Sequence, residues 1–337
     1  MLARIAQELF WLGRDLTRAE HTARMLDGAF HADVAGGAGG TESRGIALSW
    51  SGVLAIIGAK PPAPGEGGAR EDAEQTTLEW ATGLLNRAEI APLLTLDTDS
   101  PASIVSCVAR ARERGRTLRD VISTEMWESL NSFYLSLGRY DMQAALLTGP
   151  YSLYQAVKER CALFWGLVER TMLRDEGRSF LEAGGRIEEA DMVLRMLRVT
   201  VPLEEGDAGE LGHEVEALAL LQAVGGFQAY RRAVRQAPNL RTVAHFLLHE
   251  GSYPGSVASS VSALREALET ADAAPRSSPP VLRLGRLIAD LELQRRMPGT
   301  GEPLGEMFAR VQEELELVDR DIDERYFAIA ALAAVHL

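Results

Sequence analysis

Cysteine is scarce in this sequence, and the scarcity limits which compartments and chemistries fit it. Only Cys107 and Cys161 occur among the 337 residues, and they do not form a Cys-x-x-Cys pair. Two isolated cysteines exclude a disulfide framework. The sequence therefore indicates a reducing compartment and a cytoplasmic protein, in which both cysteines are unreactive thiols buried within helices.

Positive charge is also in short supply. The 35 Lys and Arg residues face 48 Asp and Glu residues, which leaves a formal net charge of −13. This balance argues against broad electrostatic binding to nucleic acid or to anionic lipid. We therefore expect no nucleic-acid partner and no membrane association, although an acidic chain can still carry a local basic patch.

Long apolar runs and catalytic signature motifs are missing as well. The longest apolar stretch, residues 46–59, is interrupted by Ser49, Ser51 and Gly52 and is shorter than the roughly 20 residues that span a bilayer. The N-terminal segment carries a charge every few positions, unlike a signal peptide. We find no P-loop, dinucleotide fingerprint or nucleophile elbow, so the sequence predicts no cofactor.

What the sequence does contain is helical periodicity along nearly its whole length. In residues 2–27, apolar side chains recur every three or four positions, which is typical of one buried face of an amphipathic helix. Alternating strand patterns are nearly absent. We predict an all-α protein with a single domain over residues 1–337, folded as a multi-helix bundle of about eight to ten helices.

The same pattern gives the expected helices and connections. One long helix is expected at residues 102–137, with a kink near Gly115. Asp99 or Ser100 can cap its start, with Pro101 in its first turn. The other helical segments are residues 2–27, 46–59, 71–90, 151–173, 178–200, 210–235, 240–250, 254–270, 281–296 and 303–336. The connections rich in glycine or proline are residues 36–40, 60–68 and 272–280.

Two segments of the chain are similar to each other. Residues 12–27 align with residues 183–198, and a glycine, an acid and an Arg-Met-Leu triplet recur at matching positions. The match favours an internal duplication with repeat halves at residues 1–150 and 151–337. A chance match between two amphipathic helices is the alternative.

Each aligned segment places one carboxylate beside its buried face. At about 100° per residue, Glu20 and Asp191 each lie roughly 60° from the centre of the apolar face, near Gly13 and Gly184 respectively. Glycine inside a helix costs about 1 kcal/mol relative to alanine, so a close approach is expected there. Two interpretations stay open: each acid pairs with the arginine four positions later, or the acids form an inward-facing site.

Five motifs spread along the chain are similar to those of a known family. They are AQELFWLGRDLTRAEHTARMLD, ARERGRTLRDVISTEMWESLN, SFLEAGGRIEEADMVLRML, AYRR with HFLLHEGSYPGSV, and LGRLIADL with the closing DERYF. Together they resemble the bacterial alpha-E domain family, an all-helical family, over nearly the whole chain. The residues that fit the family pattern include Arg14, Arg18, Glu20, Arg24, Arg112, Glu113, Arg116, Arg119, Glu125, Trp127 and Asn131.

The chain also departs from the pattern that this resemblance implies. Gln7 and Thr17 stand where the family usually has glutamate, and Gly185 and Glu189 stand where it usually has arginine. A Phe-Pro-Arg-Ser segment becomes Tyr-Pro-Gly-Ser here, with Gly255 in place of the arginine. These departures suggest a divergent member that is specialised for one pathway.

The resemblance implies a setting for the protein. Members of the family are typically encoded beside, or fused to, circularly permuted ATP-grasp proteins, often with transglutaminase-like peptidases nearby. ATP-grasp enzymes join a carboxylate to an amine through an acyl phosphate. We therefore expect an accessory or interaction subunit that works with an ATP-grasp amide ligase and binds either the ligase or its peptide or amino-acid substrate. Association of the chain with itself stays open.

A stripe of arginines is one candidate binding surface. Arg112, Arg116 and Arg119 share one side of the expected helix and can bind phosphate or carboxylate groups. A solvated face paired with nearby acids is the alternative. Glu125 and Arg24 join the candidate binding residues because they fit the family pattern.

A second candidate lies on the first helix. Trp11 shares one side of that helix with Arg14 and Arg18, so the indole and the guanidinium groups can stack. An ordinary packing tryptophan beside solvated arginines is the alternative.

The competing function is that the chain is itself an enzyme of the same pathway. Glu20 and Asp191 would then be the acid–base groups of a central cavity, with arginines as anion clamps. No metal site is expected, because His245 and His249 share a helical face without a third ligand. The acidic run at residues 313–324 is interpreted as a solvated face, with docking to a basic partner as the alternative.

Overall fold

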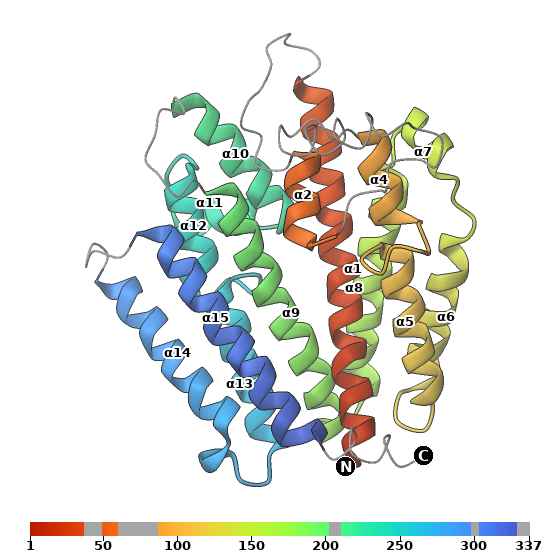
Figure 1. Cartoon of the computed structure of the whole chain (residues 1–337), viewed down its shortest axis with the longest axis vertical. Coiled ribbons are helices and arrows are strands. Elements are labelled where there is room, and N and C mark those ends of the chain that lie inside the picture. The colour runs from red at the N-terminus through yellow and green to blue at the C-terminus, as the bar shows by residue number, and fades with distance from the viewer. Residues whose placement is uncertain (37–48, 60–86, 202–209, 298–302, 329–337) are drawn as a thin grey trace, which may run out of the picture.

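Helices account for nearly all of the described chain. The computed structural model describes residues 1–36, 49–59, 87–201, 210–297 and 303–328. These residues form fourteen α-helices and contain no strand (Figure 1). The all-α prediction is confirmed, but the predicted count of eight to ten helices is too low.

Two long helices form the centre of the fold. Helix α1 (Ala3–Gly36) and helix α9 (Glu176–Thr200) lie side by side and run in the same direction, with the most extensive contact of any helix pair (Figure 1). Their apolar residues at helical spacing are buried, including Leu9 and Leu16 in α1 and Leu194 in α9. The amphipathic pattern in the sequence therefore marks the faces that meet at the centre.

Glycine brings the two central helices unusually close. A Cβ atom on Gly184 would lie 1.8 Å from the carbonyl oxygen of Phe10, and one on Gly13 would lie 2.2 Å from that of Leu181. No residue with a side chain fits at either place without parting the backbones. The close approach expected at these glycines is confirmed, and in each case the approaching group is the other helix.

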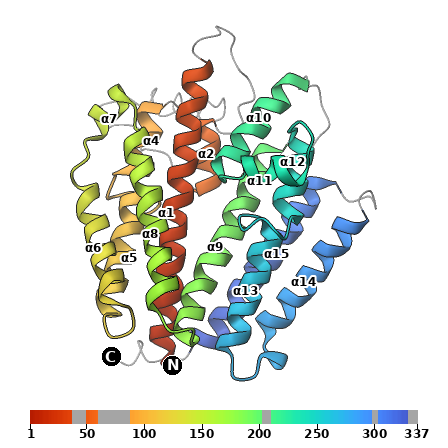
Figure 2. The ribbon, with the colours of Figure 1, turned by 180° about the vertical axis from the view of Figure 1, so that it is seen from behind.

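The long helices flank this pair on two sides. One side holds α5 (Ile104–Thr117), α6 (Thr124–Leu137) and α8 (Tyr151–Thr171), and the other holds α13 (Val257–Ala271), α14 (Pro279–Arg296) and α15 (Leu304–Ile322). Figure 2 shows α8 beside α1 and α13 beside α9 from behind. Most of the shorter helices gather toward the end of the bundle where α1 finishes. They are α2 (Trp50–Ile57), α4 (Arg87–Thr95), α7 (Met142–Thr148), α10 (Glu210–Ala223), α11 (Phe227–Ala233) and α12 (Leu240–His249).

The prediction of one long helix at residues 102–137 is wrong, because this segment forms two helices, α5 and α6. The chain turns between α5 and α6, and the two helices pack against each other. Leu118 and Ile122 in the turn are buried, so the apolar spacing continues through it and conceals it in the sequence. The turn therefore accounts for part of the shortfall in the predicted number of helices.

Helix α5 also begins later than predicted. Ser103, rather than Asp99 or Ser100, caps it by accepting a hydrogen bond of 3.1 Å from the amide of Ser106. Pro101 therefore lies in the turn before the helix and not in its first turn. Most of the helix predicted at residues 71–90 and the connection at residues 60–68 lie outside the described residues.

The two aligned segments occupy equivalent places in the structure. The offset that aligns Gly13 with Gly184 also aligns Phe10 with Leu181, so the two glycine contacts correspond to each other across the helix pair. In addition, α5 packs on α1 as α13 packs on α9, and a serine caps each of these flanking helices. The internal duplication itself stays a prediction.

Two further properties bear on the sequence predictions. Among the described residues, none of the helices combines the length and the apolar character needed to span a membrane. Cys107 and Cys161 are free and fully buried, and burial raises the pKa of the Cys107 thiol to about 12. The prediction of two buried thiols is confirmed.

Candidate functional site

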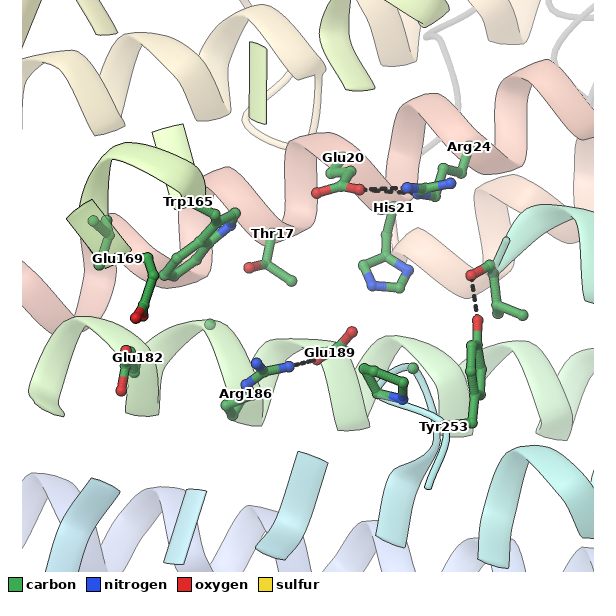
Figure 3. Close-up of a pocket in the computed structure, with 15 residues that line it drawn as sticks. Thr17, Glu20, His21, Arg24, Trp165, Glu169, Glu182, Arg186, Glu189 and Tyr253 are labelled. Atoms are coloured by element: carbon green, nitrogen blue, oxygen red, sulfur yellow. Dashed lines mark hydrogen bonds and ion pairs between the residues drawn. The ribbon is translucent and has the colours of Figure 1, made fainter. Parts of the chain in front are cut away.

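A cavity of about 390 Å³ lies beside the central helix pair. Its walls are α1, α8 and α9, and the turn before α13 closes one end (Figure 3). We call it the α1–α9 cavity. Its floor is formed by Thr17 and Gly185, and Trp165 of α8 packs so closely over Gly185 that a Cβ there would lie 2.8 Å from the indole. The absence of a side chain at Gly185 therefore makes room for the Trp165 ring, which forms part of the cavity wall.

Charged groups line this cavity as internal ion pairs. Glu20 accepts hydrogen bonds from Arg24 one turn later, with a shortest distance of 2.7 Å, and Glu189 pairs with Arg186 at 2.8 Å (Figure 3). The side chains of Glu20 and Glu189 are each only 19% exposed. Carboxylates and guanidinium groups held at the edge of a cavity can recognise ammonium and carboxylate groups of an occupant.

The closing turn is fixed by a partly buried tyrosine. The hydroxyl of Tyr253 donates a hydrogen bond of 2.7 Å to the carbonyl oxygen of Val224 (Figure 3), and its ring stacks on Phe246. Burial raises the pKa of Tyr253 to about 12, so this hydroxyl keeps its proton at neutral pH. Gly255 lies against the Tyr253 ring, where a Cβ would be 2.8 Å from the hydroxyl oxygen. The turn is thus held in place by packing that requires glycine.

His21 points from α1 toward α9 at the side of the cavity (Figure 3). It is only 7% exposed, and its Nδ1 atom is buried with no hydrogen-bond partner among the described residues. Burial lowers the pKa of His21, so the imidazole is neutral at pH 7. A neutral imidazole has one donor and one acceptor, and an unpaired buried nitrogen costs about 1–3 kcal/mol. The ring therefore lines the cavity without a hydrogen bond from its Nδ1 atom to the described part of the fold.

A buried ion network occupies a neighbouring part of the α1–α9 interface. Glu188 is fully buried, and it accepts hydrogen bonds from Arg14 at 2.9 Å and from Arg18 at 2.5 Å. Arg14 also pairs with Asp319 of α15 at 2.9 Å. Burial alone would raise the pKa of Glu188, but Arg14 and Arg18 outweigh it and hold the pKa below its usual value. We call Arg14, Glu188 and Arg18 the ion triad.

The residues of the ion triad align with three residues that line the cavity. The offset that aligns the two glycine contacts places Gly185, Thr17 and Glu189 at the positions equivalent to the three triad residues. One location is filled by two arginines around a glutamate, whereas the equivalent location carries a glycine, a threonine and a glutamate. Two of these positions thus hold smaller residues on the side where the cavity lies.

The two acids predicted as catalytic do not line this cavity together. Glu20 lines it and pairs with Arg24, whereas Asp191 pairs with Arg195 at 2.9 Å and accepts a hydrogen bond of 3.1 Å from Gln312 of α15. Burial raises the pKa of Asp191. Of the two interpretations of these acids, pairing with the arginine four positions later is the one that the geometry shows.

The predicted arginine stripe lies away from the cavity, on the α5–α6 pair. Arg112 binds Asn131 at 2.8 Å and also pairs with Glu113, which pairs in turn with Arg116. Arg119 lies 4.5 Å from the centre of a tryptophan ring of α6. The stripe is therefore largely paired with neighbouring acids and aromatic rings. Glu125, in the first turn of α6, is exposed and does not line the cavity.

The predicted contact of Trp11 with an arginine is present. The Arg14 guanidinium lies 4.7 Å from the centre of the Trp11 ring, within the range of a cation–π contact. The acidic run at residues 313–324 is not simply a solvated face, because Asp319 binds Arg14 and both Glu314 and Asp321 bind Arg283.

Four of the five residues that we expect to depart from the family pattern lie in one place. Thr17, Gly185, Glu189 and Gly255 all line the α1–α9 cavity, although they come from three distant segments, whereas Gln7 does not line it. The resemblance implies separately, in three motifs, that these residues depart from the family pattern, and only the fold brings them together. The four residues line the cavity or its closing turn.

Several residues of the site escaped sequence analysis. His21 and Glu188 lie one or two positions from residues that were singled out, and their helical positions alone did not distinguish them. Trp165 belongs to a helix that carried no motif, and its approach to Gly185 depends on the packing of α8 against the central pair. The available signal was the glycine pair at 184–185, which indicates close contact on two sides of one helix.

Comparisons with known proteins place these features in context. The family model Alpha-E, described as a predicted alpha-helical domain with a conserved ER motif, matches residues 1–327. The uncharacterized proteins Mb2597 of Mycobacterium bovis and Rv2567 of Mycobacterium tuberculosis are each 25% identical over 284 residues, which cover 82% of this chain. The match spans only 31% of the length of these relatives. No solved structure matches the chain significantly.

Proposed function

The chain belongs to the Alpha-E family, and from this premise we propose that it is a cytoplasmic accessory subunit of an ATP-grasp amide ligase. In this role it holds the peptide or amino-acid substrate that the ligase extends. The ligase supplies the acyl-phosphate chemistry, and this chain supplies a site that orients one reactant. The partnership follows from the setting that the family resemblance implies.

The α1–α9 cavity is the observation that carries the proposal. It is large enough for a small peptide or an amino acid, its ion pairs offer both signs of charge, and the imidazole of His21 lines it. Amino acids and peptides carry an ammonium group and a carboxylate, so a site with both signs of charge suits them. A binding role also fits the acids better than joint acid–base catalysis, because Asp191 faces Gln312 rather than the cavity.

The length of the relatives supports work beside a second unit. In the mycobacterial proteins, the matched region makes up about a third of the chain. A domain that occurs within a much longer protein is suited to cooperation with a neighbouring domain. In the present protein, the same cooperation would take place with the ligase as a partner, either bound or fused.

The experiment is to express the chain with the ATP-grasp protein encoded beside it and to measure both association and ligase turnover. We expect the two proteins to purify together, and we expect turnover to fall when this chain is omitted. A ligase that is fully active alone and never retains this chain would overturn the proposal. Replacing Glu113, an exposed residue outside the cavity, with glutamine provides a control that should leave turnover unchanged.

A further inference from the structure

A second cavity, of about 200 Å³, continues the first along helix α1. Arg24 lines both cavities, and the second is completed by Asp27, His31 and Lys158. From this arrangement, and on the basis of the proposed function, we propose that the two cavities form one polar groove for an extended peptide of about four residues. Its amino end lies near Thr17 and its carboxyl end lies between Arg24 and Lys158.

The groove follows successive turns of a single helix. Thr17, Glu20, His21 and Arg24 line the first cavity, and the next turns of the same face line the second. Helix α8 forms one wall of both cavities, through Trp165 in the first and Lys158 in the second. Lining residues that recur on the same face of α1, opposite the same neighbouring helix, produce a linear groove and not two unrelated hollows.

The end of the groove near Thr17 is rich in carboxylates. Glu182 uses only its Oε1 atom to bind Arg178, and Glu189 uses only its Oε2 atom to bind Arg186 and Ser260, among the described residues. Each carboxylate therefore has an oxygen that can accept a further hydrogen bond. A peptide ammonium, with three N–H donors, matches these acceptors.

The opposite end offers N–H donors. Arg24 binds Glu20 through Nε and Nη2, and Lys158 binds Asp27 through one of its three N–H groups at 2.9 Å. The Nη1 group of Arg24 and the remaining N–H groups of Lys158 have no hydrogen-bond partner among the described residues. A peptide carboxylate placed between Arg24 and Lys158 satisfies both cations at once.

His21 lines the middle of the groove. It lies between the carboxylate-rich end and Arg24, so an extended peptide that joins the two ends passes the imidazole ring. The rise from Thr17 to Asp27 is about 15 Å at 1.5 Å per residue, which is the span of about four residues of extended chain.

The test is to pass a pool of random tetrapeptides with free termini over the purified full chain and to quantify the retained peptides by mass spectrometry. The same pool with acetylated amino ends, and the same pool with amidated carboxyl ends, serve as comparisons. We expect either modification to lower retention about tenfold, because each removes charge-assisted hydrogen bonds. Equal retention of the three pools, or no retention of any pool, would overturn the proposal.

Two matched variants locate the carboxyl end. Lys158→Gln removes a cation from the groove, whereas Arg160→Gln removes a cation two positions away on the same helix, outside both cavities. We expect only the first to weaken retention of the free pool, and we expect no difference between the two variants for the amidated pool. An equal effect of both variants on the free pool would contradict this placement.

The ligase partnership and the peptide groove can be refuted independently of each other. If the chain retains free tetrapeptides with the expected preference but never binds the ligase, the groove stands and the partnership falls. If the chain binds and stimulates the ligase but retains the modified pools equally well, the partnership stands and the peptide groove falls.

Discussion

Glu188 is the residue on which the centre of the molecule depends most. It is completely buried, and it neutralises Arg14 and Arg18 in the interface between α1 and α9. Because both guanidinium groups stay charged at any ordinary pH, removing the carboxylate leaves uncompensated positive charge inside the protein. We predict that Glu188→Gln lowers the free energy of unfolding by about 3 kcal/mol, as measured by urea denaturation.

The control for this variant is Glu113→Gln, because Glu113 pairs with Arg112 and Arg116 at the surface and its side chain is 54% exposed. Exposed ion pairs contribute about 0–1 kcal/mol, so this change should be nearly neutral. If the two variants have the same stability, the ion triad does not stabilise the fold.

The stability contributed by Glu188 also depends on pH. Its pKa in the folded state lies below its ordinary value of 4.5, because two arginines outweigh the effect of burial. A carboxyl whose pKa is lowered on folding stabilises the protein above the unfolded-state pKa, and this contribution is lost as the pH falls through the folded-state pKa. We therefore predict that the stability gap between wild type and Glu188→Gln is full at pH 6 and narrows below about pH 4.5.

Two other buried acids oppose this pH dependence. Burial raises the pKa values of Asp15 and Asp191, so the stability that each contributes changes with pH in the opposite direction to that of Glu188. Asp15 is present in both proteins, whereas Glu188 adds to the rise in the pKa of Asp191, and that part is lost in Glu188→Gln. Urea denaturation of the two proteins at a series of pH values measures the gap. A gap that stays constant, or grows, on acidification would contradict the assignment.

His21 separates a binding role from a structural role. Its Nδ1 atom is buried without a partner among the described residues, so the imidazole contributes no hydrogen bond from this atom to the fold. We predict that His21→Phe leaves thermal stability unchanged or raises it, because an unpaired buried polar group is replaced by an apolar ring of similar shape. Differential scanning calorimetry checks this outcome, and a large loss of stability would show that the imidazole has a structural partner.

At the scale of elements, the crossing of α1 and α9 depends on two glycines. A methyl group on Gly184 would meet the carbonyl oxygen of Phe10 at 1.8 Å, and backbone cannot move aside as a flexible side chain can. We predict that Gly184→Ala destabilises the protein by more than about 3 kcal/mol or prevents folding, since the helices must separate along their length.

Gly166 of α8 provides the matched comparison, because a methyl group at this exposed position on the helix surface would meet no other atom within 4 Å. There the intrinsic preference of helices for alanine predicts a gain of up to about 1 kcal/mol from Gly166→Ala. Thermal melting of the two variants, followed by circular dichroism, tests the predicted loss of stability in Gly184→Ala and the predicted gain in Gly166→Ala. A tolerated alanine at position 184 would contradict the close crossing.

The helices also show which element bounds can be predicted from the sequence pattern. Spacing of apolar residues predicts the bounds of α8 and α9 closely, because each is long and its apolar residues keep a helical spacing. It predicts the start of α1 but not its end, because α1 continues to Gly36, past the predicted end at residue 27. The pattern fails between α5 and α6, where Leu118 and Ile122 keep the helical spacing through a turn that has neither glycine nor proline. Ser123 caps α6 there, and a lone serine is too common to mark a helix start by itself.

At the scale of the whole molecule, the α1–α9 helix pair has two equivalent places that differ in what fills them. The ion triad fills one of them, and the α1–α9 cavity occupies the equivalent place on the aligned segment. The sequence leads us to expect that Thr17, Gly185 and Gly255 depart from the family pattern, since each lies within a single motif. It could not indicate that they share a cavity, because that depends on the packing of four elements that are far apart in the chain.

The measurement that tests the account most directly is the KM of the ATP-grasp ligase for its peptide substrate, in the presence of wild-type chain or of His21→Phe. His21 lines the proposed site without supporting the fold through its orphaned nitrogen, so the variant should bind the ligase normally. The account predicts a KM that is about tenfold higher with His21→Phe than with wild type, and an unchanged amount of bound chain. The same KM with either protein would contradict the claim that this cavity holds the substrate.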